Sequence, residues 1–265
     1  MDHLVLRDKV AVITGSGTGI GKAIAIRFAD EGAKVVVNYR RSEVAANETV
    51  QEIRRLGMEA IVVRADVSSS QDVERLFKST VETFGKVDIL VNNAGVHLDK
   101  PIVETTEEEW DRVLDINLKG TFLCSKAAIP HMTKQGKGRI VNVASTNSVS
   151  GEPNSSAYCA SKGGMAALTM QLAVELGPRN ITVNTIAPGI IDTPMAAFIF
   201  SNPALRDQVV ARTPIRRDGI PSDVAEAALF FARDGTDYIT GTFLLVDGGW
   251  MASQHTEFLF THQGT

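Results

Sequence analysis

Short runs of apolar residues alternate along this chain with longer segments in which apolar positions repeat at helical spacing. Lys9–Thr14 (KVAVIT) and Lys34–Asn38 (KVVVN) are rich in β-branched residues, which is typical of buried strands. Between them, Ile20–Glu31 places apolar side chains on one helical face, and Gly32 is suited to end that helix. The pattern predicts a strand, a helix and a second strand, which together make one βαβ unit.

The same alternation continues as far as residue 246. Further strands are predicted at Ala60–Arg64, Ile89–Asn92, Arg139–Val143, Thr182–Ala187 and Phe243–Val246. Further helices are predicted at Ser42–Leu56, Ser70–Phe84, Thr106–His131 (opened by a capping box from Thr106 to Glu109), Ala157–Leu176 and Ser222–Phe231. Because the strands are apolar on both faces, we expect a three-layer α/β fold with a seven-stranded parallel sheet between two layers of helices.

One segment, Ile190–Gly219, interrupts this rhythm with prolines and short apolar pieces such as Met195–Phe200. A long insert of this kind in a compact domain is usually functional. We therefore interpret residues 1–265 as a single domain in which residues 190–219 form a lid over a site. The tail Met251–Thr265 shows no periodicity, which leaves open a frayed end or a contact used in assembly.

Composition excludes several classes of function. The net charge of −4 and the lack of a long basic run argue against nucleic-acid binding. Five scattered histidines show no metal-ligand spacing, and the two cysteines, Cys124 and Cys159, suit a reducing compartment. The sequence has no signal-peptide pattern and no apolar run of bilayer-spanning length, so we expect a cytoplasmic protein without a membrane partner.

The turn after the first predicted strand is rich in glycine and reads Gly15-Ser16-Gly17-Thr18-Gly19-Ile20-Gly21. Glycines at a strand-to-helix turn let the backbone approach a pyrophosphate closely, and the following helix offers free N–H groups at its N-terminus. Inside a βαβ unit, this spacing predicts a site for the phosphates of a dinucleotide.

Tyr158 and Lys162 lie four positions apart in a predicted helix, and therefore on the same helical face. A free phenol has a pKa of about 10, and a nearby ammonium lowers that pKa. The pair is therefore a candidate general acid and base tuned toward neutral pH. Ser145, at the end of a predicted strand, adds a hydroxyl that suits the same site.

Five motifs occur in a fixed order along the chain. They are Thr14-Gly15-x-x-x-Gly19-x-Gly21, Asn92-Asn93-Ala94-Gly95, Ser145, Tyr158-x-x-x-Lys162 and Pro188-Gly189. From about Leu6 to Trp250 this order resembles the short-chain dehydrogenase/reductase family. The resemblance implies a Rossmann-type fold whose strand ends line a cofactor crevice. It also implies an NAD(P)-dependent oxidoreductase that interconverts a secondary alcohol or hemiacetal and a carbonyl.

The resemblance further implies a role for each matched residue. Tyr158 would donate a proton to the carbonyl oxygen, and Ser145 would hydrogen-bond the same oxygen. Lys162 would lower the tyrosine pKa and hold the nicotinamide ribose, while Asn117 would anchor a water that links Lys162 to solvent. The implied cofactor-binding residues are Gly15, Ser16, Thr18, Gly19, Ile20, Gly21, Tyr39, Arg40, Arg41, Asp66, Val67, Asn93, Ala94, Gly95, Tyr158, Lys162, Pro188, Gly189, Ile191 and Thr193.

The end of the second predicted strand indicates which cofactor is preferred. NAD-specific sites place an acidic residue there, whereas this chain has Asn38-Tyr39-Arg40-Arg41. Arg40 or Arg41 suits a 2′-phosphate, so we expect NADP to be preferred. Thr18 stands where many NADP-using relatives carry a basic residue, so we expect NAD to be tolerated.

The substrate stays open between several classes. Val37–Arg40, the run Ser161–Gly164 and the overall length resemble glucose 1-dehydrogenases, and nearly as much 3-oxoacyl-carrier-protein reductases. The apolar piece Met195–Phe200 suits a greasy substrate, whereas Glu152 and Asn154 suit hydroxyl groups. A non-catalytic dinucleotide sensor is less favoured, because such proteins tend to lose the candidate catalytic residues. An epimerase of the family's longer branch would need a substantial C-terminal substrate domain.

The same resemblance implies a homotetramer. The long helices Thr106–His131 and Ala157–Leu176 would form one interface, and the last strand, Phe243–Val246, would form another. Dimers and tetramers with closed symmetry are the common outcomes of such contacts.

Overall fold

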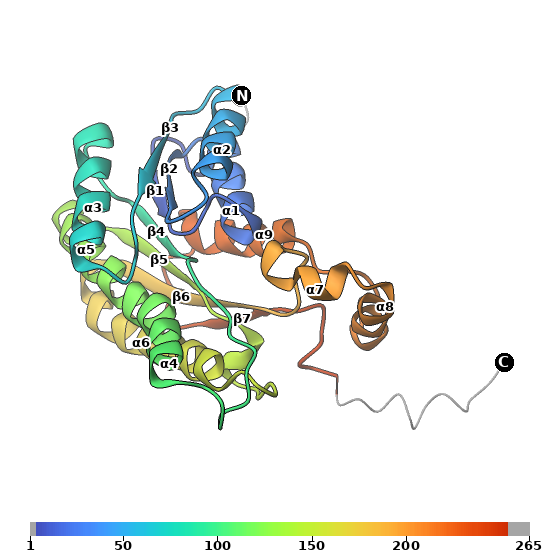
Figure 1. Ribbon diagram of the computed structural model, residues 1–265. Helices are drawn as coiled ribbons and strands as arrows, with labels where there is room; N and C mark the ends of the chain where they lie inside the picture. The colour runs from blue at the N-terminus through green and yellow to red at the C-terminus, as the bar shows by residue number, and fades with distance from the viewer. Residues whose placement is uncertain (1–3, 254–265) are drawn as a thin grey trace.

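The computed structural model describes residues 4–253. Seven parallel strands form one sheet in the order β3-β2-β1-β4-β5-β6-β7 (Figure 1). The strands are β1 (Val10–Ile13), β2 (Lys34–Tyr39), β3 (Ala60–Arg64), β4 (Ile89–Asn92), β5 (Gly138–Val143), β6 (Ile181–Pro188) and β7 (Phe243–Val246). The predicted parallel sheet is confirmed, and every predicted strand is present with its ends within one residue.

Helices cover both faces of the sheet, as the apolar strand faces predicted (Figure 1). One face packs against α1 (Gly19–Asp30), α2 (Glu43–Arg55) and α9 (Pro221–Ala232). The other packs against α3 (Ser70–Phe84), α5 (Gly120–Gln135) and α6 (Ser156–Leu176). Successive strand side chains point to opposite faces, so β1 contributes Ile13 to the first layer of core and Val12 to the second.

The helix predicted at Thr106–His131 is instead three consecutive segments: α4 (Glu107–Leu114), a π-helical stretch at Asp115–Lys119, and α5. The predicted capping box is present, because Glu109 N–H donates to Thr106 Oγ1 and Thr106 N–H donates to the Glu109 carboxylate. The π-helical stretch was not predicted, since no propensity pattern distinguishes it from an α-helix. Such stretches are frequent at functional sites, and this one carries Asn117.

The insert after β6 forms a short 3₁₀ turn (Pro194–Ala196), α7 (Ala197–Phe200) and α8 (Pro203–Arg212). A parallel bridge between Ile191 and Gly219 joins the two ends of the insert. In Figure 1, α7 and α8 stand apart from the helix layers. None of the helices in residues 4–253 has an apolar stretch sufficient to cross a bilayer. Residues 254–265, most of the predicted tail, lie outside the described residues.

The place of β1 between β2 and β4 determines where the sheet forms a crevice for a ligand. This strand pairs with β2 on one side and with β4 on the other, so Ile13 lies beside both Val37 and Val91. The helices that follow β1 and β4 lie on opposite faces of the sheet. In open α/β sheets, such a reversal leaves a crevice at the carboxyl ends of the strands.

Candidate active site

The glycine turn after β1 brings backbone close to backbone at the mouth of this crevice. Gly15 and Gly19 have φ of 61° and 56°, a left-handed conformation that glycine adopts without strain. A Cβ at Gly15 would lie 2.9 Å from Ala94 Cα. Thr18, the N-cap of α1, makes no side-chain cap, so the first N–H groups of the helix have no partner from that side chain. The turn therefore fits a pyrophosphate at the helix N-terminus.

Asn93 and Thr14 hold this turn against the end of β4. Asn93 Nδ2 donates to the carbonyl oxygens of Thr14 and Gly15 at 2.9 and 3.1 Å. Thr14 Oγ1 accepts from the N–H groups of Asn93 and Ala94 at 2.9 and 3.0 Å. These bonds hold the glycine turn directly against the Asn93–Gly95 segment.

At the carboxyl end of β2, one of the two basic side chains is ion-paired within the protein. Arg40 Nε lies 2.7 Å from Asp66 Oδ2, so the predicted phosphate ligand is ion-paired with the predicted adenine neighbour. Arg41 lines the same cavity, with no ion pair among the described residues. Both arginines line the cavity at this end.

Three predicted cofactor residues, Ser16, Gly21 and Tyr39, do not line the cavity. The Ser16 hydroxyl donates to Ile13 O at 2.7 Å and accepts from Asn38 N–H at 3.1 Å, so it stabilises the turn from within. Tyr39 packs into the core on the α1 and α2 side, because strand side chains alternate. Asn38, which no motif indicated, lines the cavity instead and accepts from Gly15 N–H at 3.1 Å.

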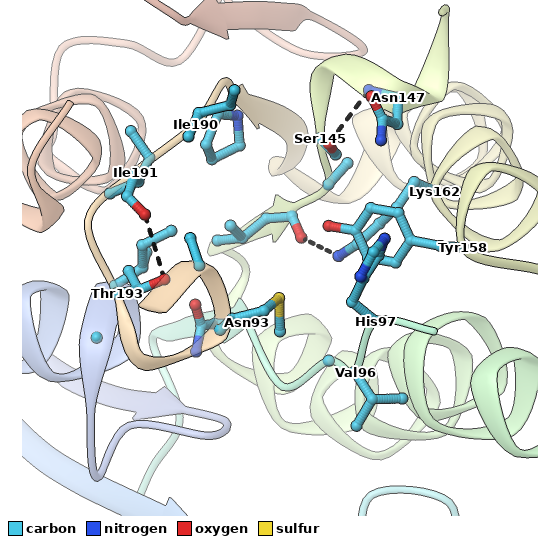
Figure 2. Close-up of a pocket in the computed structure, with 18 of the residues that line it drawn as sticks. Asn93, Val96, His97, Ser145, Asn147, Tyr158, Lys162, Ile190, Ile191 and Thr193 are labelled. Atoms are coloured by element: carbon cyan, nitrogen blue, oxygen red, sulfur yellow. Dashed lines mark hydrogen bonds between the residues drawn. The ribbon is translucent and has the colours of Figure 1, made fainter. Parts of the chain in front are cut away.

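Tyr158, Ser145 and Lys162 lie together at the opposite end of the crevice (Figure 2). Ser145 follows β5, and its hydroxyl accepts from Asn147 N–H at 3.1 Å. Lys162 is 4% exposed, and its ammonium donates to Val143 O at 2.9 Å while lying 5.6 Å from the centroid of the Tyr158 ring. The helix α6 thus carries the tyrosine and the lysine to the end of the strand that carries the serine.

Asn117 lies behind this group rather than in the cavity wall. Its Oδ1 accepts from Val96 N–H at 2.8 Å, and its Nδ2 donates to Val96 O and Ser161 Oγ, both at 3.0 Å. A Cβ at Gly95 would be 3.3 Å from Asn117 Oδ1 and 3.6 Å from Lys162 Nζ, so both side chains lie close to the backbone of Gly95. The π-helical stretch therefore sets Asn117 beside Lys162, between α6 and the segment after β4.

The predicted lowering of the tyrosine pKa is not found in the fold. Burial raises the pKa of Tyr158 to about 12, a hydrogen bond with Ser145 opposes the rise, and the charge of Glu152 adds to it. Burial also lowers the pKa of Lys162 to about 8. The prediction rested only on the charge of the neighbouring ammonium, whereas desolvation dominates both groups.

One cavity of about 850 Å³ joins these two ends. It is lined by every predicted site residue except Ser16, Gly21, Tyr39 and Asn117. Pro188 at the end of β6 lines it, as do Gly189, Ile191 and Thr193 just after the strand. Glu152 also lines it, but Asn154 does not: Asn154 has φ of 61° in a turn, and its carbonyl accepts from Lys100 N–H.

Several residues of the cavity wall were not predicted from the sequence. They lie on one face of α8 and, in the loops, at His97, Asn147 and Trp250. Met195, Phe198 and Ile199 also line the cavity, and they belong to the apolar piece Met195–Phe200 that the sequence placed in the lid. The α8 residues Leu205, Gln208, Val209 and Arg212 recur at helical spacing, which is the one signal that could have indicated this face.

Comparison with known proteins agrees with this geometry. The family model described as "Enoyl-(Acyl carrier protein) reductase" matches residues 15–251. A curated relative, 3beta-hydroxysteroid dehydrogenase 1 from Eggerthella lenta, is 44% identical over 245 residues, which cover 92% of this chain and 94% of the relative. A 3-oxoacyl-[acyl-carrier-protein] reductase from Staphylococcus epidermidis is 40% identical over 242 residues, covering 91% and 98% of the two chains.

Solved structures agree with these relatives. One is assigned provisionally as an NAD(P)-dependent gluconate 5-dehydrogenase from Beutenbergia cavernae, with NADP bound at low occupancy. It superposes with a TM-score of 0.89 at 36% identity, covering 95% of this chain and all of that chain. The resemblance drawn from the motifs is confirmed. The chain belongs to the short-chain dehydrogenase/reductase family, whose members are NAD(P)-dependent oxidoreductases that act on CH–OH and carbonyl groups.

Proposed function

We propose that this protein interconverts a secondary alcohol and a ketone on a bulky, largely apolar substrate, with Tyr158 as the proton-transferring group. The observation that carries the proposal is the single cavity that joins the Tyr158 end to the glycine turn. A bound nicotinamide cofactor would supply or accept the hydride. In this proposal, residues at the glycine-turn end bind the dinucleotide. Residues at the Tyr158 end orient the carbonyl and transfer the proton.

In this proposal, reduction uses the protonated form of Tyr158. The raised pKa keeps its phenol protonated at neutral pH, so the proton is available to the forming alkoxide. Ser145 donates a second hydrogen bond to the same oxygen and limits its position. The Lys162 ammonium stabilises the negative charge left on the phenol, and Asn117 positions the α6 helix beside the segment after β4.

The wall opposite Tyr158 supports an apolar substrate. Met195 and Phe198 line the cavity and are 50% and 60% exposed, which leaves apolar surface for a ligand to cover. Val209 on α8 extends the same wall. We further propose that the insert 190–219 acts as a lid of this single domain, since its ends are joined at Ile191 and Gly219 while its helices border the cavity.

The sequence resembles two kinds of enzyme, glucose 1-dehydrogenases and 3-oxoacyl-carrier-protein reductases, and their substrates are the alternatives. The glucose 1-dehydrogenase-like activity is the second candidate, because Glu152 and Asn147 offer polar groups at the reacting end. An absorbance assay at the nicotinamide wavelength would compare a 3-ketosteroid, glucose and a 3-oxoacyl thioester. We expect the largest kcat/KM for the 3-ketosteroid. A larger kcat/KM for glucose or for the thioester would assign the enzyme to that substrate in place of the steroid. No turnover of any of the three substrates would contradict the proposed function.

NADP is the proposed preferred cofactor, with NAD tolerated. Replacing Arg40 by Ala should lower kcat/KM for NADP by about tenfold or more, because hydrogen bonds to charged groups are worth about 1.5–3 kcal/mol. The kcat/KM for NAD, which lacks the 2′-phosphate, should fall much less. Arg41→Ala, measured in parallel, tests the arginine that has no ion pair with Asp66. A wild type that favours NAD, or equal losses for both cofactors, would show that these arginines do not select the phosphate.

We also propose that the protein is a homotetramer. On the outer surface of α5 and α6, Phe122, Met170 and Val174 are 46%, 57% and 82% exposed, and a second copy would cover such side chains. Leu245 on β7 is also exposed. Light scattering at micromolar concentration should give four times the chain mass. Phe122→Glu should reduce that mass, and a monomeric wild type would contradict the proposal.

A further inference from the structure

A small group of polar side chains interrupts the apolar wall beside Tyr158. His97 lies edge-on to the Tyr158 ring, with the ring centroids 4.8 Å apart and the planes at 85° (Figure 2). Glu152 Oε2 lies 3.7 Å from His97 Nε2, and Glu152 also accepts a hydrogen bond from Asn147 Nδ2. His97, Asn147 and Glu152 all line the cavity, and the proton-transfer scheme above uses none of these side chains.

The hydrogen bonds around His97 indicate which ring nitrogen is free. His97 Nε2 is 2.9 Å from Ser155 Oγ, and that hydroxyl donates to Pro153 O at 3.3 Å. The Glu152 carboxylate, 3.7 Å from Nε2, favours the tautomer with the proton on Nε2, which then donates in the bond with Ser155. In the neutral ring, Nδ1 is then an acceptor. Within residues 4–253, Nδ1 has no hydrogen-bond partner and is not among the buried polar atoms sealed from solvent.

Glu152 presents a second acceptor to the same space. Its side chain is 46% exposed, and the neighbouring His97 ring, whose Nε2 is 3.7 Å away, holds the pKa of the carboxyl below its usual range, with Asn147 contributing further. An ionised carboxylate only accepts hydrogen bonds, and it repels an anionic group placed beside it. A substrate group that suits both side chains must therefore be a hydrogen-bond donor without a negative charge.

We propose that His97 and Glu152 bind a hydroxyl group of the substrate next to the reacting carbon. The preferred substrates are then hydroxyketones and the corresponding diols, with the rest of the molecule against the apolar wall. The hydroxyl is not altered in the reaction; it accepts no hydride and loses no proton. This inference rests on the proposed function and specifies its substrate class. An ether or a methyl group in the same place offers no donor, and a carboxylate would be repelled by Glu152.

The test compares two ketones that differ only in this donor: 2-hydroxycyclohexanone and 2-methoxycyclohexanone. The readout is the ratio of their kcat/KM values for reduction within each variant, which cancels differences in the amount of folded enzyme. We expect a wild-type ratio of about tenfold or more in favour of the hydroxyketone, since one donor is bound by a charged group. His97→Phe, which keeps a ring beside Tyr158, and Glu152→Gln should each bring the ratio toward one. Glu104→Gln, an exposed carboxylate outside the cavity wall, should leave it unchanged.

A wild-type ratio near one with normal turnover would overturn this inference and leave the proposed function standing. The inference is also overturned, with the proposed function intact, if both variants keep the wild-type ratio or if the enzyme reduces other ketones but not the hydroxyketone. Failure to reduce any ketone would overturn the proposed function, and this inference with it.

Discussion

Tyr158→Phe should lower kcat for ketone reduction by about 10²–10⁴-fold, the usual cost of losing a general acid. The phenylalanine ring can still pack edge-on against His97 and beside Lys162, so the fold and the dinucleotide end of the cavity should be unaffected. Only the transferable proton and its hydrogen bond with Ser145 are removed. Steady-state kinetics give the loss, and cofactor titration should return a Kd close to that of the wild type.

The matched control is Tyr238→Phe, which removes a phenol hydroxyl from a fully exposed side chain. Its kcat should equal that of the wild type. If Tyr158→Phe keeps more than a tenth of the wild-type rate, the proton comes from another group and the proposed role is wrong.

The pH profile of the wild type supplies a second readout of the same role. Because the raised pKa keeps Tyr158 protonated well above neutral pH, this group should not limit reduction between pH 6 and about 10. Lys162, with its pKa lowered to about 8, loses its charge as pH rises through that value. Reduction should therefore decline above pH 8, with an apparent pKa that belongs to the coupled pair. A reduction rate that stays flat to pH 10 would remove Lys162 from the mechanism.

The fold could be predicted from the sequence because its signals are local. Each strand is a short, mostly apolar run, each helix repeats its apolar positions, and glycines mark the turns, so the parallel sheet and its boundaries followed directly. The π-helical stretch at Asp115–Lys119 is different. Its residue Asn117 bonds with Val96 and Ser161, which are distant in the sequence, and no local pattern indicated the stretch.

The site also has a part that the sequence predicted and a part that it did not. Residues fixed by backbone geometry, such as Gly15, Gly19 and Asn93, were found from motifs, because the turn needs those residue types at those positions. The side-chain contacts around these residues could not be predicted. The Arg40–Asp66 ion pair and the placement of His97 beside Tyr158 join residues far apart in the chain. The dominance of burial over charge at Tyr158 likewise requires the folded structure, since desolvation has no sequence pattern.

Gly21→Ala should abolish high-affinity cofactor binding and destabilise the fold by about 1–3 kcal/mol, the usual cost of overpacking. A Cβ at this position would collide with Asn93 Nδ2, and it would lie 2.5 Å from Gly15 O and 2.8 Å from Ser16 Cα. Two of these contacts are backbone atoms of the turn itself, which has no room to yield. The third is the amide that ties the turn to the end of β4 through Thr14 O and Gly15 O. One methyl group therefore separates two segments that together form the dinucleotide end of the cavity.

The affinity for NADP should fall by at least about tenfold, since the loss of even one hydrogen bond to a charged group is worth about 1.5–3 kcal/mol. Isothermal titration of NADP gives the affinity, and thermal unfolding gives the change in stability. Gly177→Ala is the matched control: its φ is −51°, a Cβ there would meet no atom within 4 Å, and it should leave both quantities near the wild-type values. If Gly21→Ala binds NADP as tightly as Gly177→Ala does, close approach at Gly21 is not what shapes the phosphate site.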